Sequence, residues 1–163
     1  KFDNSQMPLE IKKINLTKLL EEVVKNMKPP AAQKDIALSS FLQETVIIDG
    51  DEDQLKRLFE NLIDNAIKYT YRKGKVMISA HRDEKQAKIT VSDTGLGMPE
   101  DELLYIFDRF YQINKSRTNK QSFGLGLSIA KSIADSHKGR ITAESQLGKG
   151  SIFTVYLPIS YPG

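Results

Sequence analysis

The segment from Asp51 to Tyr69 carries the strongest helical pattern in the chain. Its apolar residues recur at intervals of three and four, which places them on one stripe of a helix; they are Leu55, Leu58, Leu62, Ile63 and Ala66. Acidic residues gather at its start, where the helix dipole favours negative charge. Because a helix of this kind is stabilised mainly by burying its stripe, the chain must fold a second apolar layer against it.

The rest of the chain alternates between short strands and helices. Leu16 begins a second amphipathic helix with Asn15 as its N-cap, and Pro29-Pro30 should end or kink that helix. Gly124 begins a third helix. β-Branched and apolar runs predict strands at residues 11–14, 36–41, 45–48, 75–80, 86–91, 140–144 and 151–157. This mixture predicts a two-layer α/β (α+β) sandwich, with helices covering one face of a mixed sheet.

Composition narrows the class of protein. A length of 163 residues suggests one domain, and the absence of cysteine excludes a disulfide scaffold and a thiolate nucleophile. The net charge of +3 is spread along the chain, so we expect no nucleic-acid partner. No apolar run reaches membrane-spanning length. Since the chain begins with Lys1, we interpret it as a fragment with a linker at residues 1–10 and a domain at 11–163.

One polar face of the strongest helix is a candidate ligand site. Asn61, Asn65 and Lys68 share a face that is displaced from the apolar stripe. An amide oxygen is a suitable neutral ligand for Mg²⁺, and Lys68 would meet phosphate charge. Tyr69 follows and can lie beside a base. The alternative is a solvated face, although asparagine is a mediocre helix former and two of them in a strong helix weaken that interpretation.

Two glycine-containing turns extend the candidate site. Asp93 ends a strand before Gly95 and Gly97, so its carboxylate can accept a hydrogen bond from an exocyclic amine; the alternative is a simple Asx turn. Gly124-Leu125-Gly126 begins a helix, where free N–H groups favour phosphate. It follows a basic segment at 115–120, whose lysines and arginine either contact phosphate or only improve solubility.

The chain has two histidines, and neither is interpreted as catalytic. His81 ends a hairpin strand and is expected to be a solvated surface residue. His137 lies at a helix end near Gly139, where a cationic side chain suits the dipole and a left-handed cap favours glycine.

Taken together, these segments resemble the catalytic ATP-binding domain of sensor histidine kinases, within the superfamily that includes gyrase, heat-shock chaperone ATPases and mismatch-repair ATPases. The resemblance covers about residues 11–158 and rests on four boxes in order: the N box at 61–70, a glycine box at 93–97, the F box at 107–110 and a second glycine box at 124–128. It implies the Bergerat-type fold, with a mostly antiparallel sheet, about three helices and a mobile ATP lid at about 98–123.

The resemblance also implies a role for each matching residue. Asn65 would ligate Mg²⁺, Asp93 would accept the adenine amino hydrogen, and Thr154 would share a water beside it. The expected catalytic residues are Asn61, Lys68 and Arg109. The implied ATP contacts are Asn61, Asn65, Lys68, Tyr69, Asp93, Gly95, Gly97, Arg109, Lys115, Arg117, Gly124, Leu125, Gly126, Leu127 and Thr154.

Two positions depart from related patterns. Asn61 stands where gyrase-like ATPases carry a Glu that activates water, so intrinsic hydrolysis should be poor. Gln112 stands where many histidine kinases carry Arg, so Lys115 or Arg117 supplies that phosphate contact or it is lost.

The resemblance further implies partners. The phosphoryl acceptor would be a histidine on a separate dimerisation domain, and a response regulator receiver domain would act downstream. We expect a monomeric cytoplasmic domain without direct membrane contact, from a homodimeric parent for which an inner-membrane location stays open. Two alternatives remain: a self-sufficient ATPase used for conformational switching, and a non-catalytic module that binds nucleotide or nucleic acid through residues 115–120.

Overall fold

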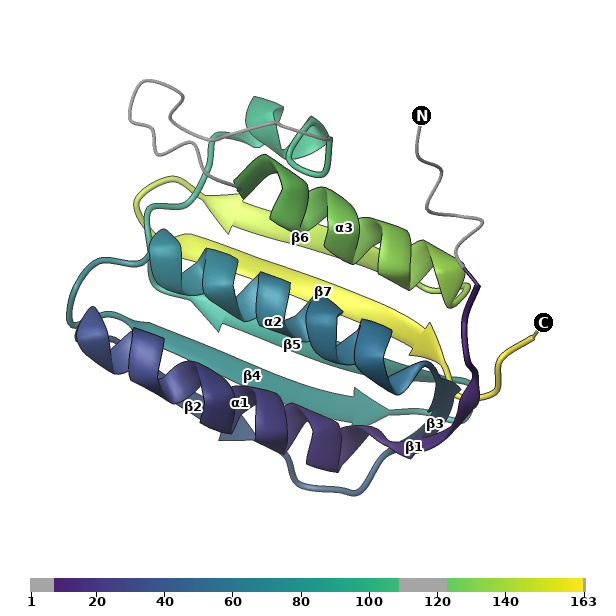
Figure 1. The fold of residues 1–163 in the computed structure, drawn as a ribbon. Coiled ribbons are helices and arrows are strands. Elements are labelled where there is room, and N and C mark those ends of the chain that lie inside the picture. Colours follow the sequence, from purple (N-terminus) through teal and green to yellow (C-terminus); the bar gives the residue numbers. More distant parts are fainter. Residues whose placement is uncertain (1–7, 109–122, 163) are drawn as a thin grey trace.

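The computed structural model of the protein describes residues 8–108 and 123–162. Three α-helices cover one face of a five-stranded sheet (Figure 1). The elements are β1 (Lys12–Asn15), α1 (Leu16–Gln33), β2 (Ala37–Phe41), β3 (Ile47–Gly50), α2 (Glu52–Lys68), β4 (Lys75–Arg82), β5 (Gln86–Asp93), the 3₁₀ helix η2 (Glu100–Leu104), α3 (Phe123–Ser136), β6 (Arg140–Gln146) and β7 (Gly150–Pro158). The predicted two-layer sandwich is confirmed.

The five-stranded sheet has the order β2-β4-β5-β7-β6. Only the β2–β4 pair is parallel, and the other three pairs are antiparallel, so the sheet is mixed and mostly antiparallel as expected. Residues of one parity on β4 and β5 are buried against the helices, whereas the other parity faces away from them. The core therefore lies between the helices and one face of the sheet.

The helix α1 continues through the proline pair that was expected to end or kink it. Pro29 and Pro30 lie inside the helix, which continues to Gln33. Ala31 in that final turn is buried, and Lys34 and Ile36 donate backbone hydrogen bonds to its carbonyl oxygen. Tertiary packing thus overrides a local breaker signal. Of the two predicted outcomes, an end or a kink, the end of the helix at the prolines is wrong. At the other end, the N-cap is confirmed because Asn15 accepts a hydrogen bond from the Lys18 backbone.

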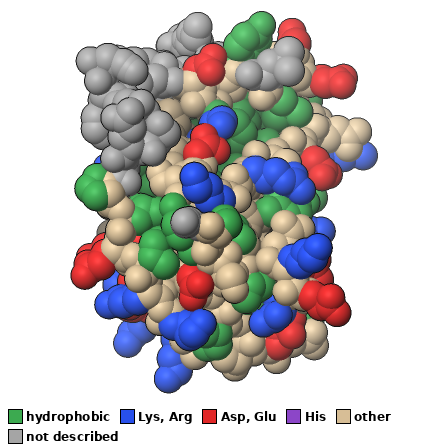
Figure 2. Space-filling view, turned by 90° about the vertical axis from the view of Figure 1, so that its right-hand side faces the viewer, with side chains coloured by type: hydrophobic (Ala, Val, Ile, Leu, Met, Phe, Trp, Pro, Cys, Tyr) green, Lys and Arg blue, Asp and Glu red, His purple; other side chains and the backbone are tan. Residues whose placement is uncertain are grey.

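A small second sheet lies at one end of the molecule. β1 pairs with β3 and lies near the C-terminus, at the right in Figure 1. Asp49 and Gly50 belong to β3, which extends beyond the predicted strand end at residue 48. Figure 2 shows that Lys and Arg side chains alternate with Asp and Glu over this end, consistent with the ion pair between Lys13 and Asp49. None of the helices described is long and apolar enough to cross a bilayer.

The end of α3 differs from the expectation in two ways. The left-handed residue is Lys138, with φ 65°, rather than Gly139. Gly139 is needed for a close approach instead, because a Cβ atom there would lie 2.1 Å from the Tyr156 carbonyl oxygen. His137 is 1% exposed, and burial lowers its pKa, so it is not a cationic cap. Its Nε2 accepts from the Asp51 backbone N–H at 3.0 Å, and its Nδ1 lies 2.9 Å from the Ile133 carbonyl oxygen.

This buried histidine predicts a pH dependence of stability. Because burial depresses the folded-state pKa of His137, the unfolded chain binds a proton below about pH 6.5 that the folded chain excludes. The free energy of unfolding should therefore fall as the pH drops below about 6.5 and should level off above it. Urea unfolding of the wild type and of His137→Gln between pH 5.5 and 8 measures this, and the variant should be less stable but lose that acid-side slope.

The exposed His81 supplies a matched control. His81→Gln makes the same chemical change on the surface and should leave the slope unchanged. If the free energy of unfolding of His137→Gln depends on pH as steeply as that of the wild type, the pH dependence comes from other groups, such as the carboxylates.

Candidate nucleotide-binding site

The motifs singled out in the sequence meet at one end of the sandwich. The C-terminal end of α2, the Asp93 end of β5 and the start of α3 all lie at the left in Figure 1, with α2 and α3 side by side. The turn between β6 and β7 reaches the same end. The fold thus brings together amide and ammonium groups, a carboxylate and a helix N-terminus.

The helix α2 presents the predicted polar face. Asn61 and Asn65 are half-buried and Lys68 is exposed, while the residues of the apolar stripe are buried. The Lys68 ammonium lies 3.0 Å from the Asp64 carboxylate. A phosphate group would have to compete with this partly exposed ion pair, which costs little because such pairs contribute only about 0.3–0.5 kcal/mol.

Tyr69 joins the helix to the loop after Asp93. Its backbone N–H donates to the Asn65 carbonyl at 3.2 Å, and its own carbonyl accepts from Leu96 N at 3.0 Å. A Cβ atom at Gly95 would lie 2.2 Å from that carbonyl, so this loop can approach α2 only with glycine there. The Tyr69 side chain is half-buried, and burial raises its pKa. The end of α2 and the loop therefore form one connected wall.

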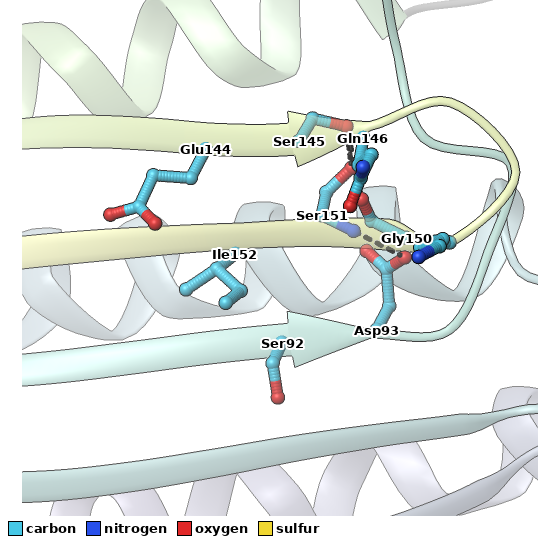
Figure 3. Close-up of a pocket in the computed structure, with 9 residues that line it drawn as sticks. Ser92, Asp93, Glu144, Ser145, Gln146, Gly150, Ser151 and Ile152 are labelled. Carbon is cyan, nitrogen blue, oxygen red and sulfur yellow. Dashed lines mark hydrogen bonds between the residues drawn. The ribbon is translucent and has the colours of Figure 1, made fainter.

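Asp93 is half-buried at the end of β5. Its Oδ1 accepts from Gly95 N at 2.8 Å and from Ser151 N at 3.3 Å, and burial raises its pKa (Figure 3). The first bond forms the Asx turn that the sequence left as an alternative. In the described part of the chain Oδ2 has no hydrogen-bond partner, so Asp93 can hold its turn with one oxygen and accept from a ligand with the other.

Thr154 does not lie beside Asp93. The residue directly opposite Asp93 is Ser151. Thr154 lies three residues further along β7 and pairs with Thr90. Because side chains alternate along a strand, Thr154 belongs to the face away from the helices. Ser151 is the hydroxyl residue next to Asp93, and its Oγ lies 2.9 Å from Ser145 Oγ. The sequence signal for it was its position directly after the Gly148–Gly150 turn.

A cavity of about 350 Å³ lies behind Asp93 (Figure 3). Its lining includes Ser92, Glu144 and Ile152, which point away from the helices, but neither Asn61 nor Asn65. Asp93 and Ser151 also line this cavity, which therefore reaches the end of β5 but not the polar face of α2.

The start of α3 agrees with the predicted phosphate turn as far as it is described. Gly124 and Leu125 lie in the first helical turn. A Cβ atom at Gly126 would meet no atom of the described residues within 4 Å, whereas Leu127 is buried. Gly97 has φ +70°, a left-handed conformation that favours glycine. The predicted contacts Arg109, Lys115 and Arg117, the position Gln112 and most of the predicted lid at 98–123 lie outside the described residues.

Part of the F box and the short helix before it are described. A 3₁₀ helix covers Glu100–Leu104, just before the F box. The Phe107 ring packs edge-on against Phe153, with centroids 6.1 Å apart, and Ile106 is fully buried. These contacts hold residues 106 and 107, which lie within the predicted lid, against the core.

The donors fit Mg²⁺ only together with a phosphate ligand. No cluster of three or more His, Cys, Asp or Glu side chains occurs among residues 8–108 and 123–162. Asn61 and Asn65 offer neutral amide oxygens one helical turn apart. Mg²⁺ takes few protein ligands and keeps waters and phosphate oxygens, so this sparse donor set suits it and does not suit a metal held by protein alone.

Comparison with known proteins agrees with this geometry. Residues 50–161, more than half of the chain, match the family of histidine kinase-, DNA gyrase B- and HSP90-like ATPases. The chain belongs to that family.

Within this family, the individual relatives that the chain resembles are sensor kinases. The chain is 45% identical to the sensor histidine kinase RppB of Synechocystis sp., over 88% of this chain and 32% of RppB. It spans about a third of the length of its first curated relatives.

Solved structures with the same fold are catalytic domains or larger kinases. The catalytic domain of the histidine kinase ThkA matches with a TM-score of 0.82 and 27% identity, over 93% of this chain and 99% of that chain. ThkA was also solved with the response regulator protein TrrA (TM-score 0.78, 27% identity, 93% and 42% coverage). Full-length ShkA in complex with AMPPNP matches with a TM-score of 0.81 and 26% identity, over 96% and 33% of the two chains.

Proposed function

We propose that this domain binds Mg²⁺–ATP and donates the γ-phosphoryl group to a histidine on a separate dimerisation domain of a two-component sensor kinase. The observation that carries the proposal is the convergence of the Asn61–Lys68 face, Asp93 and the α3 N-terminus at one end of the fold. The AMPPNP complex of ShkA, a structural neighbour, supports an adenine nucleotide as the ligand.

Each described residue has a proposed task. Asp93 would accept the adenine amino hydrogen through Oδ2, and Tyr69 would flank the ring. Asn65 would hold the metal through its amide oxygen, with Asn61 supporting it. Lys68 would leave its ion pair with Asp64 and bind a phosphate group instead. The N-terminus of α3 would lie beneath the phosphates. Catalysis would come mainly from positioning and charge neutralisation, as phosphoryl transfer requires.

A self-sufficient ATPase is the weaker alternative. Water attack would need a base near the γ-phosphate, and the amide of Asn61 cannot accept that proton. The histidine acceptor of the proposed transfer is itself the nucleophile and needs no such residue.

The surrounding assembly is also part of the proposal. The partners would be the histidine-bearing dimerisation domain and a response regulator receiver domain, as the ThkA–TrrA complex suggests. The domain itself would be a cytoplasmic monomer from a homodimeric parent, with residues 1–10 as its linker. Glu10 already meets the domain, because its backbone N–H donates to Asp51 Oδ2 at 2.9 Å.

Calorimetric titration with ATP, with and without Mg²⁺, tests the proposal. Asn65→Ala should weaken Mg²⁺–ATP binding by roughly three- to tenfold, because one ligand to the metal–phosphate unit is lost. The loss for ATP without Mg²⁺ should be smaller. The residue faces away from the buried stripe, so the fold should survive.

The exposed Asn26 on α1 offers a matched control. Asn26→Ala makes the same change within a helix and should leave both affinities as they are. Equal losses for Asn65→Ala with and without Mg²⁺ would count against a metal role, and an absence of ATP binding by the wild type would overturn the proposal itself.

A further inference from the structure

The side chain of Lys34 caps the helix that carries the nucleotide motif. Lys34 lies just after α1, and its ammonium donates to the carbonyl oxygens of Ile67 at 2.9 Å and Lys68 at 2.7 Å. These carbonyls belong to the last turn of α2, where C=O groups have no N–H partner four residues further along the helix. The Ile67 carbonyl also accepts from Thr70 N at 3.4 Å. A positive charge there also matches the negative end of the helix dipole.

The capped carbonyls lead directly into the wall of the candidate site. Tyr69 follows them, and its carbonyl holds the loop after Asp93 through Leu96 N at 3.0 Å. The neighbouring Asp35 adds a second connection, since its carbonyl accepts from Lys73 N at 2.7 Å. The turn after α1 therefore holds the chain on both sides of Tyr69.

We propose that Lys34 is a positioning residue of the nucleotide site, which fixes the end of α2 so that Tyr69 and the loop around Leu96 keep their distance from a bound base. Lys34 touches neither the proposed metal nor the proposed phosphates, so it acts through the backbone of α2. This inference rests on the function proposed above and adds a residue outside the four motifs.

The surroundings of Lys34 distinguish it from a solubilising lysine. Its side chain is half-buried, and burial lowers its pKa. No carboxylate pairs with its ammonium in the described part of the chain. Two main-chain carbonyls therefore offset the partial loss of hydration of this half-buried ammonium group.

Three variants test the role. Lys34→Met keeps the length of the side chain but removes the donor, and Lys34→Arg keeps a donor and the charge. Lys28→Met makes the same change at an exposed position on α1. Calorimetry should give weaker ATP binding for Lys34→Met, roughly three- to tenfold, because part of the loss of a charged hydrogen bond reaches the site. Lys34→Arg should restore most of the affinity.

Two further measurements separate positioning from general stability. Adenosine should lose affinity by the same factor as ATP, with or without Mg²⁺, because the displaced wall is on the side of the base. Amide hydrogen exchange at Leu96 should accelerate in Lys34→Met and stay unchanged in Lys28→Met.

The outcomes separate this inference from the proposed function. A Lys34→Met protein that melts earlier but binds ATP and adenosine like the wild type overturns the positioning role while the proposed function stands. A wild type that binds no ATP overturns the proposed function instead, and the exchange rate at Leu96 still reports whether Lys34 holds the loop.

Discussion

Asp93→Asn should weaken ATP binding by about tenfold or more, although the turn around Asp93 stays intact. The amide oxygen can replace Oδ1 and keep the bonds from Gly95 N and Ser151 N. The amide nitrogen then occupies the position of Oδ2, where the adenine amine would donate. Two donors would face each other, and a poorly paired buried group costs roughly 1–3 kcal/mol. Titration calorimetry with ATP measures the loss.

Two controls sharpen this result. Asp83 makes the same kind of turn at the far hairpin, where its Oδ1 accepts from Lys85 N and Gln86 N at 2.8 and 2.9 Å. Asp83→Asn should leave ATP affinity unchanged. Inosine triphosphate lacks the exocyclic amine, so Asp93→Asn should affect it much less than ATP. Unchanged ATP affinity in Asp93→Asn would reduce Asp93 to a turn residue.

The helix α2 was predictable because its signals are local. Its apolar stripe and acidic start predict residues 51–69, and the structure has Glu52–Lys68 with Asp51 and Tyr69 as caps. The same local rules fail at Pro29-Pro30, where the packing of Ala31 keeps the helix intact. Intrinsic helix propensity therefore sets a helix boundary where tertiary packing favours neither outcome. Where packing does favour one outcome, as at Ala31, packing sets the boundary.

The site was predictable in its motifs but not in its long-range partners. Asp93 was singled out, yet its hydroxyl neighbour is Ser151 rather than Thr154, because strand register depends on how two hairpins align. The position of His137 predicts a cap at the end of a helix. In the structure it accepts a hydrogen bond from Asp51 N, a residue 86 positions away that no local pattern could indicate. Lys34 belongs to no motif, since only the folded chain brings it to α2.

The isolated chain should bind ATP yet accumulate no phosphohistidine. Its two histidines are poorly placed for transfer. His81 is exposed on β4 and pairs with Lys88, so its side chain lies on the sheet face away from the helices. His137 is buried at the far end of α3 from the glycine turn. Radiolabelled ATP, followed by a test for label that is stable to alkali and labile to acid, should give none.

Addition of the parent's histidine-bearing domain should change this result completely. Label should then appear on that domain, and a variant of its acceptor histidine should abolish it. His81→Ala in the present chain should leave the transfer unaffected, whereas Asp93→Asn should slow it at ATP concentrations below saturation because less nucleotide is bound. Stoichiometric labelling of His81 or His137 in the isolated chain would contradict transfer to a separate domain and would identify a self-contained kinase.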